Sequence, residues 1–114
     1  MTDYDFGDVL LVPFPFTDHT TTKKRPAVVV SSTTYSKERP DVVLIAITSA
    51  KVSHAYFGDT PVQSWKEAGL LKPSTMKAIF STLDKRLVYR KLGKLASGDK
   101  AALQEMLLIS LGEG

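Results

Sequence analysis

The sequence has no cysteine among its 114 residues and only two histidines. Without cysteine the protein can form neither a disulfide nor a thiolate zinc site, and it has no cysteine nucleophile. The two histidines, His19 and His54, lie far apart and form neither an HxH nor an HExxH arrangement. Because metal sites need clustered ligands, we expect neither a metal centre nor any other cofactor.

Several motifs and long apolar runs are also missing. Neither GxGxxG nor GxxxxGK[ST] occurs, which argues against nucleotide hydrolysis, and no GxSxG elbow supports a Ser-His-Asp triad. The N-terminus, MTDYDFGD, is too acidic and polar for a signal peptide. No apolar run approaches the roughly 20 residues that span a bilayer. We expect a soluble protein of the bacterial cytoplasm with no membrane partner.

The composition is that of one compact domain spanning residues 1–114, because 43% hydrophobic residues suffice for a single core and no repeat or linker interrupts the chain. The formal net charge of +3 is modest, but the cations form two clusters. These contain Lys23, Lys24 and Arg25, and then Lys85, Arg86, Arg90, Lys91 and Lys94. The clusters indicate an anionic partner such as nucleic acid, although two solvated basic faces would give the same pattern.

Short β-type segments separated by turn signals run through most of the chain. They are Val9–Val12, Pro26–Ser32, Asp41–Thr48, a weaker Tyr56–Gln63, and Met76–Leu83. Pro13 should end the first strand or place it at an edge, and Thr17–Lys24 is predicted as an exposed loop. The second and third segments are apolar on both faces and therefore central. The spacing predicts a small barrel or a curled antiparallel sheet.

The C-terminal stretch SGDKAALQEMLLISLG predicts a helix instead. Its apolar residues recur at helical spacing at Leu103, Met106, Leu107 and Leu111. Ser97 is the expected N-cap, Asp99 lies in the first turn, and Gly112 ends the run. We expect this helix to pack on the sheet, which gives an α+β fold, mainly β; a partner-binding helix is the alternative.

The remaining chemistry is a metal-free site of arginine, histidine and hydroxyl groups, the set that RNA cleavage can use. The 2′-OH of RNA attacks the adjacent phosphorus when a base takes its proton, and the charge that develops needs fixed donors. Arg25 offers a planar fork for phosphoryl oxygens, and Pro26 restricts its backbone. Thr48 and Ser49 could add hydroxyls beside it if their strands are neighbours.

These segments carry a family resemblance. In order and approximate spacing, GDVLLVPFPF, RPAVVVSS, LIAITS, AGLLKPS and TLDKRLVYRKLGKLAS resemble the MazF/PemK toxins of bacterial toxin-antitoxin pairs. The resemblance implies an SH3-like antiparallel barrel with a packed C-terminal helix, the fold that the CcdB and Kid toxins share. It also implies a homodimer that cleaves single-stranded RNA without metal, leaving a 2′,3′-cyclic phosphate and a 5′-OH.

The resemblance also assigns site residues. Arg25 and Thr48 match the family's catalytic pair, and Ser49 matches an adjacent RNA contact. His19 matches a loop histidine that some members use as acid or base, and a solvent-exposed loop histidine without a catalytic role is an equally good interpretation. Lys23, Lys24, Pro26 and Lys77 complete the predicted RNA contacts, with an outward-facing strand lysine as the alternative for Lys77. The Arg-x-Asp pair of some members is replaced here by Met76, Lys77 and Ala78.

The leading hypothesis is therefore a sequence-specific endoribonuclease toxin that inhibits translation and is held in check by a cognate antitoxin. The antitoxin is expected to present an acidic segment with apolar anchors, disordered when free. A gyrase-poison-like toxin of the same fold and a non-catalytic RNA-binding module are the alternatives.

Overall fold

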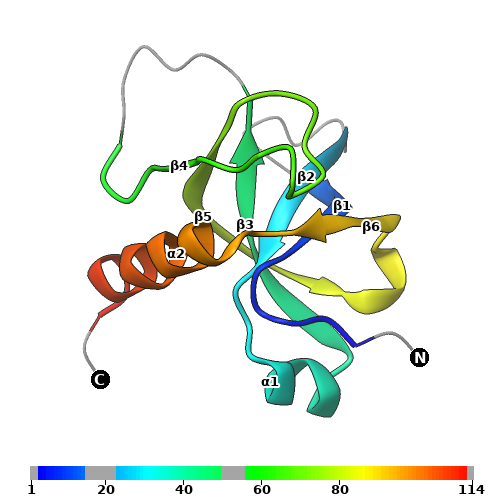
Figure 1. The fold of residues 1–114 in the computed structure, drawn as a ribbon. Coiled ribbons are helices and arrows are strands. Elements are labelled where there is room, and N and C mark those ends of the chain that lie inside the picture. The colour runs from blue at the N-terminus through cyan, green and yellow to red at the C-terminus, as the bar shows by residue number, and fades with distance from the viewer. Residues whose placement is uncertain (1–2, 15–22, 50–55, 113–114) are drawn as a thin grey trace.

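The computed structural model describes residues 3–14, 23–49 and 56–112, and within them the chain forms one curled antiparallel sheet with a C-terminal helix against it (Figure 1). The strands are β1 (Asp8–Phe14), β2 (Lys23–Val29), β3 (Asp41–Thr48), β4 (Thr60–Val62), β5 (Ser74–Asp84) and β6 (Arg90–Lys94). The helices are α1 (Thr33–Glu38), the 3-10 turn η1 (Lys85–Leu87) and α2 (Ser97–Ser110). The strand order is β4-β5-β3-β2-β1-β6. The predicted fold class is confirmed.

The central strands β2 and β3 are apolar on both faces because each face of the sheet has its own core. On one face Val28 and Ile45 pack in a buried cluster that also contains Leu103 and Met106 of α2. On the other face the buried cluster includes Val29 and Leu44 of the same strands. Consecutive residues of a strand point to opposite faces. An uninterrupted apolar run is therefore what this position in the sheet requires.

The first hairpin differs from its predicted boundaries. β1 continues through Pro13 to Phe14, and β2 begins at Lys23. Within the described residues β6 pairs with β1 only from Asp8 to Leu11. At Pro13 the β6 side of β1 therefore has no partner strand, and the missing N–H of proline is tolerated at such an edge. Lys23 and Lys24 thus belong to a strand, and the rest of the predicted Thr17–Lys24 loop lies outside the described residues.

Helix α1 and strand β6 are among the elements that the sequence did not predict. The α1 sequence TTYSKE has no apolar period, and its start is fixed by the Ser32 hydroxyl, which accepts a hydrogen bond from the Tyr35 N–H at 3.0 Å. The β6 sequence RKLGK is basic and contains no β-branched residue. It becomes a strand by pairing with β1. Both elements depend on contacts that a local pattern does not reveal.

Helix α2 is present as predicted, but its N-cap lies one residue before the predicted N-cap, Ser97. Ala96 occupies the cap position and makes no side-chain cap hydrogen bond, so Ser97 is the first helical residue and not the N-cap. The buried carboxylate of Asp99 accepts hydrogen bonds from the backbone N–H groups of Gln63 and Ser64 at 2.9 and 2.8 Å. Asp99 therefore ties α2 to the segment after β4. No helix in the described part of the chain is long and apolar enough to cross a bilayer.

Candidate active site

The two residues predicted as the catalytic pair stand opposite each other at one end of the central strands. β2 and β3 pair Ala27 with Ala46 and Val28 with Ile45. Continuing this register by two residues places Arg25 opposite Thr48. On its other side Arg25 pairs with Val12 of β1. Arg25 and Thr48 thus lie on the same face of the sheet, since directly paired residues share a face.

A third polar residue, Thr75, extends this arrangement. β3 and β5 pair Thr48 directly with Thr75. Arg25, Thr48 and Thr75 therefore form one cross-strand row over β2, β3 and β5, and all three are half-buried. We name it the catalytic row after the predicted catalytic pair that it contains. A row that carries one guanidinium and two hydroxyls offers a planar fork and further donors, which suits the oxygens of a phosphate. No sequence pattern pointed to Thr75, because its place in the row follows from strand pairing alone.

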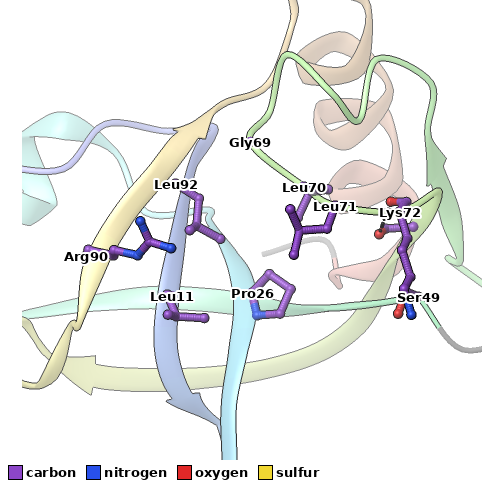
Figure 2. A pocket seen from close by; sticks show the side chains of 10 residues that line it. Leu11, Pro26, Ser49, Gly69, Leu70, Leu71, Lys72, Arg90 and Leu92 are labelled. Carbon is purple, nitrogen blue, oxygen red and sulfur yellow. Dashed lines mark hydrogen bonds between the residues drawn. The ribbon is translucent and has the colours of Figure 1, made fainter.

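The residues next to the catalytic row lie at a pocket of about 350 Å³, into which the row itself does not open (Figure 2). Pro26, Ser49 and Ser74 line this pocket. Its other lining residues are Leu11, Gly69, Leu70, Leu71, Lys72, Arg90 and Leu92. Ser49 therefore lies at the pocket, whereas Thr48 belongs to the row. Alternation along the strand directs neighbours to opposite faces.

The predicted contacts Lys23 and Lys24 are exposed at the start of β2, two and one residues before Arg25. The Lys24 ammonium lies 4.8 Å from the centroid of the Tyr89 ring, a cation–π distance. Tyr89 is itself half exposed. Proteins that bind single-stranded nucleic acid commonly do so with exposed aromatic rings, on which bases stack, and with basic side chains, which contact the phosphates.

Lys77 does not face solvent, so the reading of an outward-facing strand lysine is wrong. It is 9% exposed, and its Nζ lies 2.6 Å from Oδ2 of Asp59. The same carboxylate oxygen accepts the Tyr56 backbone N–H at 2.9 Å. Between Met76 and Phe80 the register of β5 against β3 shifts, which breaks the alternation that sequence reasoning assumed. Lys77 is thus engaged in a buried ion pair.

The TLDK motif of the resemblance serves a local structural purpose. Asp84 precedes η1, and its carboxylate accepts hydrogen bonds from the Arg86 side chain and backbone N–H. The Arg86 guanidinium, and then the backbone hydrogen bond, lower the pKa of Asp84 to about 2. The motif therefore fixes the turn that leads from β5 into β6.

Two predicted features cannot be placed. His19 and His54 lie outside the described residues. Within residues 3–14, 23–49 and 56–112, no three histidine, aspartate or glutamate side chains group in a way that could hold a metal ion.

Several solved structures share this fold. An endoribonuclease of a mycobacterial species, solved in complex with its cognate antitoxin, has a TM-score of 0.76 at 17% identity and covers 97% of each chain. MazF from Deinococcus radiodurans has a TM-score of 0.72 at 18% sequence identity, and the match covers 97% of this chain and 100% of that chain. Mycobacterium tuberculosis toxin MazF-mt6 has a TM-score of 0.70 at 19% sequence identity, and the match covers 88% of this chain and 91% of that chain. At these identities the likeness shows the fold alone.

A comparison with curated proteins found no significant match. A family model does match, over residues 5–111, and it is described as the PemK-like, MazF-like toxin of type II toxin-antitoxin systems. The match spans nearly all of the chain, including every strand and helix described above. The chain therefore belongs to the PemK-like, MazF-like family of type II toxins.

Proposed function

We propose that this toxin is an endoribonuclease that cleaves single-stranded messenger RNA in the cytoplasm, without a metal ion, and so inhibits translation. The observation that carries the proposal is the catalytic row. The β2–β3 register, continued by two residues from Ala27 and Ala46, places Arg25 opposite Thr48, and Thr48 pairs with Thr75. The row combines a fixed positive fork with hydroxyl groups, and the exposed Lys23 and Lys24 extend the positive charge along β2.

The proposed reaction is an internal transesterification. The 2′-oxygen of the RNA forms a bond to the adjacent phosphorus, and the bond from phosphorus to the 5′-oxygen of the next nucleotide breaks. One proton leaves the 2′-OH and one joins the departing 5′-oxygen, and His19 is our candidate for one of these transfers. Arg25 stabilises the charge that develops on the phosphoryl oxygens, and Thr48 adds a hydroxyl donor. The products carry a 2′,3′-cyclic phosphate and a 5′-OH.

The direct test is incubation of the purified protein with a defined single-stranded RNA in EDTA. We expect cleavage with cyclic-phosphate and 5′-hydroxyl ends at a shared short sequence, read by sequencing the 5′ ends. Binding without products would favour the non-catalytic RNA-binding module. Inhibition of DNA gyrase without RNA cleavage would favour the gyrase-poison alternative, which rests on the last residues of α2.

We further propose that a cognate antitoxin inhibits this toxin. The mycobacterial endoribonuclease of the same fold was solved with its cognate antitoxin, and basic groups surround the site of the present chain. An acidic segment that folds on binding would lay carboxylates against Arg25, Lys23 and Lys24 and exclude RNA. Its affinity should fall as salt rises if these charges dominate.

We propose that the toxin is a homodimer, and the exposed apolar residues of α2 and β5 support this. Leu108 is 80% exposed, and Ile109, Leu111, Ile79 and Phe80 are also exposed. Light scattering at micromolar concentration should give the dimer mass, and Leu108→Asp should shift it toward the monomer because a carboxylate would be buried at the interface. A monomeric unmodified protein would count against the dimer.

A further inference from the structure

The pocket beside the catalytic row has no part in the cleavage chemistry described above (Figure 2). Strands β1, β2 and β6 form one wall, and residues 69–72 form the other. The walls approach closely because Gly69, at φ +82°, lies against β6: a Cβ there would be 2.1 Å from the Leu92 carbonyl oxygen. The AGLLKPS segment of the sequence therefore shapes this pocket.

The pocket is apolar in its middle and positively charged at both ends. Pro26 lies centrally, with Leu11 and Leu92 toward one end and Leu70 and Leu71 toward the other. Arg90 stands at the first end, and Lys72 stands near Ser49 at the second (Figure 2). Both cations belong to exposed residues. An apolar middle with a cation at each end suits a nucleoside whose two flanking phosphates lie on either side of it.

The pocket and the catalytic row lie back to back across the ends of three strands. Each strand gives consecutive residues to the two sites: Arg25 and Pro26 on β2, Thr48 and Ser49 at the end of β3, and Thr75 and Ser74 on β5. Ser49 directly follows the last residue of β3. On each of these strands the catalytic row and the pocket are therefore one residue apart.

We propose that this pocket binds one nucleotide of the RNA substrate outside the cleaved linkage. Its base lies between Pro26 and the leucines, its polar edge faces the Ser49 hydroxyl, and its flanking phosphates contact Arg90 and Lys72. The proposal rests on the proposed function, because the RNA is the same substrate. An acidic peptide would fit the charges, but it explains neither the hydroxyl at one end nor the shared strand ends.

The test is binding of a single-stranded oligonucleotide of eight 2′-O-methyl nucleotides, which cannot be cleaved. Affinity is measured as a function of salt for the intact toxin and for the double variant Arg90→Ala, Lys72→Ala. If two phosphate contacts are lost, the slope of log affinity against log salt should become shallower by about 1.4, from about 0.7 for each contact to a single strand. The matched control is Lys66→Ala with Lys94→Ala, two exposed lysines on the same segments that do not line the pocket.

A second variant tests the apolar part. Leu71 lines the pocket but is 92% exposed, so Leu71→Asp should fold normally and weaken binding of the oligonucleotide, whereas Leu87→Asp, on exposed η1, should not. Both experiments measure binding and do not need cleavage, so their results can be interpreted even if the protein proves not to be a nuclease. An unchanged salt slope in the double variant would overturn the inference. So would unchanged RNA binding together with lost affinity for a peptide of alternating glutamate and leucine, which would make this a peptide site.

Discussion

Replacing Arg25 with alanine is expected to lower kcat for RNA cleavage by about 10²–10³-fold or more, the usual effect of removing one fixed donor to a developing negative charge. The fold should persist, because Arg25 is half-buried at the end of the sheet and outside both core clusters. Arg25→Lys should also cleave poorly, since a lysine keeps the charge and loses the planar fork. Cleavage of a defined RNA in EDTA, with circular dichroism to verify folding, measures both effects.

Arg39→Ala is the matched control for this experiment. Arg39 is a second arginine followed by a proline, but it lies at the opposite end of β3, where its guanidinium pairs with Asp41 at 2.9 Å. We expect Arg39→Ala to cleave like the unmodified toxin. Thr48→Ala and Thr75→Ala should each slow cleavage less than Arg25→Ala, because a hydroxyl is a weaker donor than a guanidinium. Near-normal cleavage by Arg25→Ala would refute the proposed site.

The central part of the site could be predicted because it depends on strand interiors and strand ends. The apolar runs before Thr48 and after Arg25 are readable from the sequence, and two such strands in a small sheet are good candidates for neighbours. Their pairing sets Arg25 opposite Thr48 once the register is known. The register itself was not readable, and so the pairing of Thr48 with Thr75 was missed.

The errors have physical causes of the same kind. Ser49 follows Thr48, the last residue of β3, and its place at the pocket depends on segments that are distant in the sequence. The pocket needs Gly69 against Leu92, two residues far apart in the chain. Lys77 was read as exposed because a lysine on a short strand usually is, whereas the register shift in β5 turns it toward Asp59. Non-local contacts decide each of these positions.

Replacing Asp59 with alanine is expected to reduce the free energy of unfolding by about 3–5 kcal/mol, the cost of leaving a buried charge without its partner. The Lys77 and Asp59 side chains are only 11% and 9% exposed, and their charged atoms are 2.6 Å apart. Asp59→Ala also removes the acceptor of the Tyr56 N–H, which adds to the loss. Urea unfolding followed by circular dichroism measures the difference.

Arg86→Ala is the matched control, because Arg86 also forms a short ion pair, with Asp84, but its side chain is 88% exposed, and this change leaves the backbone hydrogen bond to Asp84 in place. An exposed pair of this kind contributes about 0–1 kcal/mol. The double variant Asp59→Ala, Lys77→Met should recover part of the stability that Asp59→Ala loses, because no buried ammonium then remains. If Asp59→Ala cost no more than Arg86→Ala, the buried pair would not hold residues 56–60 against β5. In that case Lys77 would again be a candidate for contact with RNA.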